Sequence, residues 1–227
     1  MTGSLRDGDG STYPNVSRMT PAPPRATGVI LAITSLAFLL LTTIGALEWA
    51  AVAGGFIPAR VASGLELEGA APAWLTPLSA TLIHASFLHL IFNMVLLGYC
   101  GRLVEQAIGA GRFLALYAIG AYAAALAQYL AGPAEIAPMV GASGAASAVL
   151  GVYALLYGRQ RAAVAHPGLN RLINIAWLAA AWIGIQLLFG YAGATGGMSI
   201  AIAAHIGGFI AGLLLARPLL LSRYPSA

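Results

Sequence analysis

The sequence predicts an all-α, polytopic membrane protein, a bundle of six transmembrane helices with a long first outer loop. Hydrophobic residues make up 59% of the 227 residues and charged residues only 8%, whereas soluble domains contain about 25% charged residues. Apolar runs of about 20 residues, the length that crosses a bilayer core, recur along the chain. The arginines gather in alternate segments between these runs, which is typical of a chain that crosses a membrane repeatedly.

The expected spans follow a polar start. Residues 1–27 are rich in Gly, Ser, Pro and Arg, and we expect them to form a disordered cytoplasmic tail. The run from Gly28 to Leu47 is long enough to span, so we interpret it as the first transmembrane helix and not as a signal peptide. The membrane domain is expected over residues 28–217, with a short cytoplasmic tail over 218–227. The six spans are expected at about 28–47, 82–100, 113–131, 142–157, 172–190 and 200–216.

The arginines also predict the orientation of the bundle. Ten of the eleven lie before the first span, in the even-numbered connections or after the sixth span, and only Arg60 falls on the other side. The positive-inside rule makes the arginine-rich side cytoplasmic, so we expect both termini to be cytoplasmic. The first outer loop, from Glu48 to about Thr81, contains Phe56, Trp74 and several prolines. We expect this loop to pack on or into the lipid surface.

Charge and cysteine content exclude other classes of protein. The isoelectric point of about 9.5 comes from arginines that are spread along the chain and not gathered on one face, so no nucleic-acid partner is expected. The single cysteine, Cys100, excludes an internal disulfide and leaves no cysteine cluster for a metal.

Polar side chains inside spans are energetically costly, so they are the first candidates for function. None of the expected spans clearly contains Asp or Glu. The polar residues of interest are His84, His89 and Asn93 in the second span, Ser143 and Ser147 in the fourth, and Ser199 and His205 in the sixth. At about 1.5 Å per residue, His89, Ser143 and His205 all fall in the outer third of the membrane. Asn93 lies one helical turn below His89 on the same face.

Two stripes of small residues predict that the fourth and sixth spans approach closely. The stripes are Ser143, Ser147 and Gly151 on the fourth span and Ala204, Gly208 and Gly212 on the sixth. If the stripes face each other, Ser143 and His205 become neighbours. A serine hydroxyl is a weak nucleophile until a base takes its proton, and imidazole is the usual base near neutral pH. With no acid nearby, the pair would be a Ser-His dyad and not a triad.

Acyl transfer also needs donors for the oxyanion. His89, the Asn93 amide and the Ser143 backbone N–H at a helix start are the candidates. Gly141 and Gly144 leave room for a substrate backbone to approach Ser143.

Three segments resemble motifs of the rhomboid intramembrane proteases. Gly-Ala-Ser-Gly at 141–144 is similar to the family's Gly-x-Ser-Gly, and Ala-His-Ile-Gly-Gly at 204–208 is similar to its Ala-His-x-x-Gly. The segment 84–93 resembles the second-helix motif His-x4-His-x3-Asn, and 101–112 resembles the turn that follows that helix. The resemblance covers about 74–216, and three motifs in this order are far more specific than one.

The resemblance implies a serine endopeptidase that hydrolyses peptide bonds in or near transmembrane segments of membrane proteins. It implies that Ser143 is the nucleophile and His205 the general base, and that His89, Asn93 and the Ser143 N–H form the oxyanion hole. It also implies no metal, no other cofactor, and a transmembrane protein as substrate. Six spans without a seventh fit the basic bacterial form of the family, which is found in the inner membrane.

Two positions depart from the family pattern. Where many members have Trp-Arg in the first outer loop, this chain has Leu75-Thr76, with Trp74 one step away. Where many bacterial members have an aromatic residue that stacks on the catalytic imidazole, this chain has Ser147. The orientation of His205 must therefore come from another group.

The remaining candidates are expected to be structural. His84 is expected to hold the outer loop by a hydrogen bond, and a metal pair with His89 is disfavoured because a spacing of five residues places them on different helix faces. Ser147 and Ser199 are expected to be packing or loop residues. The glycines Gly141, Gly144, Gly151 and Gly208 support the site by packing without chemistry.

Three hypotheses about function remain. The first is an active intramembrane protease. The second is a catalytically inactive rhomboid-like protein that binds transmembrane clients; such proteins usually lack the Ser or the His. The third is a transporter or channel for small solutes, which would need polar residues along a whole path. Here the polar residues stop in the outer half, which favours a cavity open on one side.

Overall fold

The computed structural model describes residues 24–158, 167–193 and 201–225. Residues 1–23 of the expected N-terminal tail, and Ser199, lie outside the described residues. The regular secondary structure within these ranges is helical, with one isolated β-bridge between Phe56 and Met139. The helical elements are α1 (Arg25–Thr43), α2 (Leu47–Gly54), α3 (Pro58–Ser63), α4 (Thr76–Ser79), η1 (Ala80–Leu82), α5 (Phe87–Leu96), η2 (Leu97–Gly101), α6 (Arg102–Ile108), α7 (Ala110–Ala131), α8 (Ser143–Tyr157), α9 (Pro167–Gly193) and α10 (Ile202–Arg223).

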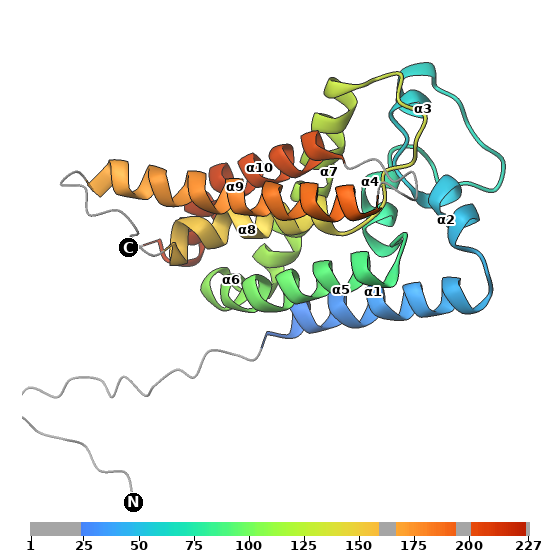
Figure 1. The fold of residues 1–227 in the computed structure, drawn as a ribbon. Coiled ribbons are helices and arrows are strands. Elements are labelled where there is room, and N and C mark those ends of the chain that lie inside the picture. The colour runs from blue at the N-terminus through green and yellow to red at the C-terminus, as the bar shows by residue number, and fades with distance from the viewer. Residues whose placement is uncertain (1–23, 159–166, 194–200, 226–227) are drawn as a thin grey trace, which may run out of the picture.

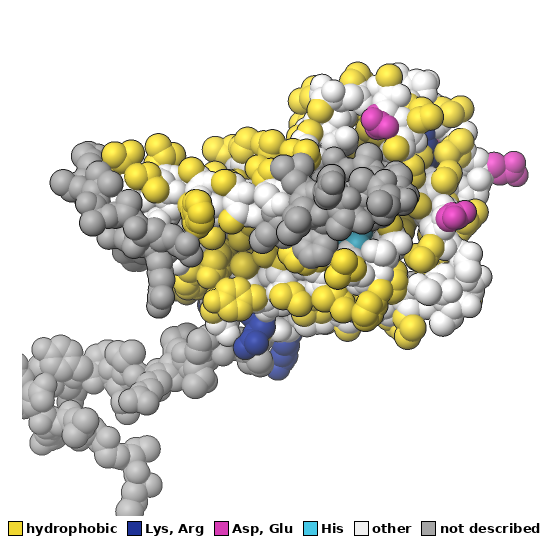
Figure 2. Space-filling model, in the orientation of Figure 1, with side chains coloured by type: hydrophobic (Ala, Val, Ile, Leu, Met, Phe, Trp, Pro, Cys, Tyr) yellow, Lys and Arg dark blue, Asp and Glu magenta, His cyan; other side chains and the backbone are white. Residues whose placement is uncertain are grey.

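Among the described residues, four helices are long and apolar enough to cross a membrane. They are α1, the continuous helix Phe87–Ile108 that joins α5, the π-helical turn η2 and α6, then α7 and α10. The long helices run roughly side by side, and α2, α3 and α4 gather at one end of them (Figure 1). Hydrophobic side chains cover much of the visible face, which suits a surface in contact with lipid (Figure 2).

The shorter helix α8 forms the centre of the bundle. Eleven of its 15 residues are buried, and most of them are Ala, Gly or Ser. Small side chains let neighbouring helix backbones come close, so α8 can pack tightly against α7 and α10 at the same time.

The second expected span is shifted along the chain. The helix starts at Phe87 and not near 82, because the Ser86 hydroxyl caps it by accepting a hydrogen bond from the His89 N–H at 3.2 Å. His84 therefore precedes the helix and does not lie within it. The segment 101–112, expected as a turn, continues the helix to Ile108, and the chain turns only at Gly109, where φ is +87°.

Both ends of the expected membrane domain also differ from the structure. The helix α1 already starts at Arg25 because the buried Glu105 carboxylate accepts hydrogen bonds from the Ala26 and Thr27 N–H groups at 2.9 and 2.7 Å. A carboxylate at a helix N-terminus satisfies free donors and complements the helix dipole.

The helix α10 continues to Arg223, so most of the expected tail 218–227 is helical. Arg223 donates to the Gln106 carbonyl at 2.7 Å, which fixes this end against α6.

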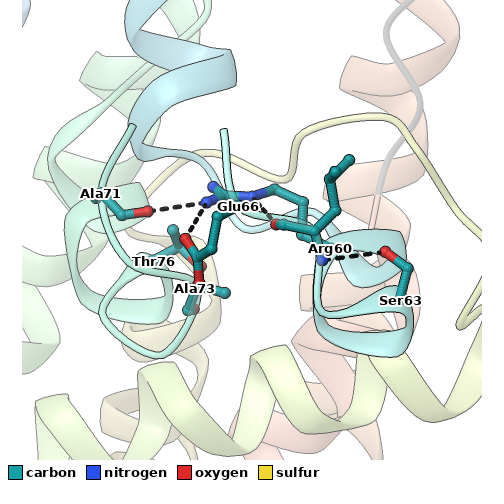
Figure 3. Close-up of polar contacts among 7 residues, drawn as sticks. Arg60, Ser63, Glu66, Ala71, Ala73 and Thr76 are labelled. Atoms are coloured by element: carbon teal, nitrogen blue, oxygen red, sulfur yellow. Dashed lines mark hydrogen bonds and ion pairs between the residues drawn. The ribbon is translucent and has the colours of Figure 1, made fainter. Parts of the chain in front are cut away.

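The long segment between α1 and α5, which was expected to form the first outer loop, is partly helical and is anchored by one buried arginine (Figure 3). Arg60 is only 3% exposed; its Nη2 donates to the Ala71 carbonyl at 3.0 Å and lies 3.8 Å from a Glu66 carboxylate oxygen. The chain lacks the Trp-Arg pair that many family members have in this loop, and no pattern in the sequence indicated that Arg60 anchors it. Trp49 and Trp74 remain 64% and 70% exposed, so this segment presents aromatic side chains at the surface.

The expected close approach of α8 and α10 is present. A Cβ atom added at Gly208 would collide with the Gly144 carbonyl oxygen, and one added at Gly212 would collide with the Ala148 carbonyl oxygen. From the other side, a Cβ at Gly151 would meet the Phe209 carbonyl oxygen. The two helices thus touch backbone to backbone, and the contact begins one residue after Ser143.

We expect Gly208→Ala to lower the stability of the bundle by about 1 to 3 kcal/mol, because the new methyl group overpacks a contact with backbone atoms. Gly184→Ala on α9 is the matched control, since a Cβ at this exposed glycine meets nothing within 4 Å. There the higher helix propensity of alanine should raise stability slightly, by about 0.5 to 1 kcal/mol. Thermal unfolding in detergent measures both variants, and equal shifts in the same direction would contradict the packing argument.

Candidate active site

Ser143 is the first residue of α8 and is buried beneath the end of the bundle that carries α2, α3 and α4. Its backbone N–H belongs to the first turn of the helix, where amide groups have no partner within the helix. The hydroxyl and the free amide of Ser143 are therefore available at the same helix end.

His205 is the fourth residue of α10 and is also buried. Its Nε2 atom lies 2.7 Å from the Ser143 Oγ atom, a hydrogen-bond distance between residues 62 positions apart in the chain. In the tautomer with Nε2 unprotonated, His205 accepts the hydrogen bond and can receive the hydroxyl proton. The backbone contact of Gly208 with Gly144 holds the two helix starts together.

The segment before Ser143 is fixed by bonds from residues 56–84. Phe56 and Met139 exchange two backbone hydrogen bonds, at 3.0 and 2.8 Å. The Gly141 N–H donates to the Ala80 carbonyl at 2.8 Å, and the Ala142 N–H donates to Nε2 of His84 at 3.3 Å. The helix start that carries Ser143 is thus held by three connections from residues 56–84. The hydrogen bond of His84 is thus to the segment before Ser143, whereas a bond to the outer loop was expected.

Gly141 is required by both conformation and space. Its φ angle is +113°, which side chains of L-residues rarely allow. A Cβ atom there would lie 2.6 Å from the Cε1 and Nε2 atoms of His89. The imidazole of His89 therefore packs directly against the backbone two residues before Ser143.

Asn93 is joined to His89 and not to the serine. Its Nδ2 atom donates to the His89 carbonyl at 2.9 Å, one turn earlier in α5. In the part of the chain that the structure describes, neither His89 nor Asn93 has a side-chain hydrogen bond to Ser143. The side-chain atoms His89 Nδ1 and Asn93 Oδ1 are buried without a hydrogen-bond partner among these residues.

The two histidines before and within α5 lie together. The ring centroids of His84 and His89 are 4.9 Å apart. The expectation that their spacing would separate them was wrong, because His84 lies before the helix and does not follow its periodicity. Within the described ranges, no group of three or more His, Cys, Asp or Glu side chains could hold a metal ion.

One residue at the site was not singled out from the sequence. The Trp182 indole N–H, from α9, donates to the Ser147 hydroxyl at 2.8 Å, and its ring centroid lies 6.0 Å from that of His205. Ser147 in turn donates to the Ser143 carbonyl at 2.7 Å. The only signal for Trp182 was indirect, namely that Ser147 stands where an aromatic residue was expected.

Comparisons with known proteins point to one family. Residues 71–222 match the family model described as the Rhomboid domain. A protein named Rhomboid protease GlpG from Serratia proteamaculans is 33% identical over 141 residues, which are 61% of this chain and 45% of that protein. Rhomboid protease GluP from Bacillus subtilis is 32% identical over 149 residues, which are 64% of this chain and 26% of that protein. The chain therefore spans less than half the length of these relatives.

Proposed function

The chain belongs to the rhomboid family of integral membrane proteins, and from this premise we propose that it is an intramembrane serine endopeptidase. It would hydrolyse peptide bonds in or near the transmembrane segments of membrane proteins. The observation that carries the proposal is the distance of 2.7 Å between Ser143 Oγ and His205 Nε2 at the adjoining starts of two buried helices.

In the proposed reaction, His205 takes the Ser143 hydroxyl proton as Oγ attacks the carbonyl carbon of the scissile bond. His205 then gives this proton to the leaving amine, and an ester to Ser143 remains. A water molecule, deprotonated by the same imidazole, hydrolyses the ester and restores the hydroxyl. Among the described residues, the His205 side chain has a hydrogen bond to Ser143 Oγ and none to a carboxylate. We therefore propose that the pair acts as a dyad.

The developing oxyanion would be bound by the Ser143 N–H, His89 and Asn93. Two contacts support this assignment. His89 packs against Gly141, and Asn93 donates a hydrogen bond to the His89 carbonyl. Together they keep both side chains in a fixed arrangement beside the segment that leads into Ser143. His84, Gly141, Gly144, Gly151 and Gly208 would support the site by holding backbones in place.

We further propose six transmembrane spans, formed by α8 and α9 together with the four helices that are long and apolar enough to cross a membrane. Arg25 and Arg102 are the first residues of α1 and α6, and Arg112 lies in the first turn of α7, whereas Glu48 and Glu66 lie in the outer segment at the opposite end. In the visible face, acidic side chains gather at the end with α2 and α3 (Figure 2). With the arginine-rich end cytoplasmic, both termini would be cytoplasmic in a bacterial inner membrane, as the bacterial relatives suggest.

The depth of Ser143 determines the substrate class. Ser143 starts α8 at the outer end, so the scissile bond should lie near the outer boundary of the membrane. A helical peptide bond is shielded by its own hydrogen bonds, so the substrate must unwind locally, which Gly or Pro would ease. Because the residues around Ser143 are small and closely packed, we propose a narrow binding site and expect Ala, Gly or Ser just before the cut. Transmembrane proteins are therefore the proposed partners, without a cofactor.

A reporter of known orientation with one transmembrane helix tests this proposal. A Gly-Ala step is moved along the helix, the reporter is reconstituted with the protein in liposomes, and the products are identified by mass spectrometry. We expect strong cleavage at the outer end and none in the cytoplasmic half, because only the outer end reaches Ser143. The Ser143→Ala variant, measured in parallel, accounts for contaminating proteases. Equal cutting at all depths, or a preference for bulky residues before the cut, would refute this description of the site.

A further inference from the structure

The Trp182 side chain lies beside the pair formed by Ser143 and His205, although the proposed reaction does not use it. It is only 5% exposed, and it comes from α9, which carries neither member of the pair. Its ring plane is inclined by 61° to the imidazole of His205, in an edge-to-face contact. Trp182 therefore borders the imidazole on a side formed by a third helix.

Trp182 is itself fixed from two directions. Its Nε1–H donates to the Ser147 hydroxyl at 2.8 Å, and Ser147 donates to the Ser143 carbonyl at 2.7 Å. These two hydrogen bonds form a chain from α9 into the first turn of α8. The ring of Phe92 on α5 stacks on the indole, with centroids 6.2 Å apart and planes inclined by 20°. The position of the indole is thus defined relative to α5 and α8.

His205 needs such a neighbour because few other contacts orient its ring. Within the part of the chain that the structure describes, its only side-chain hydrogen bond is the one with Ser143 Oγ. In a triad, a carboxylate would hold the other ring nitrogen and fix the imidazole. A single hydrogen bond leaves rotation about the side-chain bonds, which a packed aromatic ring can restrict.

We propose that Trp182 is a positioning residue for His205. Its ring keeps the imidazole oriented with Nε2 against Ser143 Oγ, and its bond to Ser147 fixes the ring. In the family pattern an aromatic residue at the position of Ser147 stacks directly on the imidazole. Here Ser147 instead accepts the hydrogen bond that holds Trp182, an aromatic residue of α9, beside the imidazole. The inference rests on the proposed function, because the orientation of the imidazole affects turnover only if His205 is the base.

The test compares Trp182→Leu with Trp177→Leu, the same change on the same helix at a side chain that is 55% exposed. We expect Trp182→Leu to lower kcat by about 10- to 100-fold, the size of effect that a misplaced catalytic group produces, with little change in KM, and to lower the thermal midpoint because the smaller side chain leaves a cavity. Trp177→Leu should leave kcat unchanged. Trp182→Phe keeps a ring and should restore most of the activity, with a loss of only about threefold from the missing hydrogen bond.

A double-mutant cycle keeps the proposal testable if Trp182→Leu does not fold. Ser147→Ala and Trp182→Phe both remove the hydrogen bond between Trp182 and Ser147, which should cost about threefold, and Ser147→Ala also removes the bond to the Ser143 carbonyl. The double variant should therefore be no worse than Ser147→Ala alone. Wild-type kcat in both single variants, or equal losses in Trp182→Leu and Trp177→Leu, would overturn the inference. Wild-type protein that neither cleaves the reporter nor reacts with a fluorophosphonate would instead refute the proposed function.

Discussion

Ser143→Ala and His205→Ala are each expected to reduce reporter cleavage by about 10⁴- to 10⁶-fold, the loss seen when a nucleophile or its base is removed. The structure gives the reason, since the two side chains share one hydrogen bond at 2.7 Å. The double variant should be no worse than either single variant, because the two groups act in the same step.

A fluorophosphonate probe separates this outcome from misfolding. The probe reacts with an activated serine hydroxyl, so wild-type protein should be labelled at Ser143, His205→Ala only slowly and Ser143→Ala not at all. Ser63→Ala is the matched serine control, because Ser63 is an exposed residue at the end of α3. All variants should keep the wild-type thermal midpoint. Full cleavage by Ser143→Ala would end the protease hypothesis, and a wild-type chain that binds clients without labelling would favour the inactive alternative.

The parts of the site that could be predicted are those encoded by local spacing. The glycine stripes on the fourth and sixth spans led to the prediction that Ser143 and His205 are neighbours, and the backbone contact of Gly208 with Gly144 has the expected geometry. Such predictions succeed because helical periodicity decides which residues share a face, and small residues decide which faces approach.

The parts that could not be predicted depend on contacts between distant segments. Glu105 lies 78 residues after Thr27, and no periodicity indicates that its carboxylate caps α1. The start of α5 was misplaced because Leu82 and Ile83 extend the apolar run, whereas the Ser86 cap defines the helix. Trp182 is 35 residues from Ser147, and its role follows only from the way α9 packs. Glu105 and Trp182 find their partners only through the tertiary fold, whereas the Ser86 cap is a local contact that the apolar run concealed.

The assignment of His89 and Asn93 to the oxyanion hole leads to a graded prediction. Removing one donor of several typically costs about 10²- to 10³-fold in rate, so His89→Ala and Asn93→Ala should be impaired but still cleave. Because an oxyanion forms only in the transition state, the loss should appear in kcat while KM changes little.

A structural role for these two residues would give a different pattern. His89 packs on Gly141 and Asn93 donates to the His89 carbonyl, so either substitution could also loosen the segment before Ser143. Loosening should lower the thermal midpoint together with the rate, and it should also appear in His84→Ala, which frees the Ala142 N–H without removing an oxyanion donor. His84→Ala is therefore the control. If His89→Ala and Asn93→Ala match it in both rate and thermal midpoint, their role is structural, and the Ser143 N–H is left as the oxyanion donor.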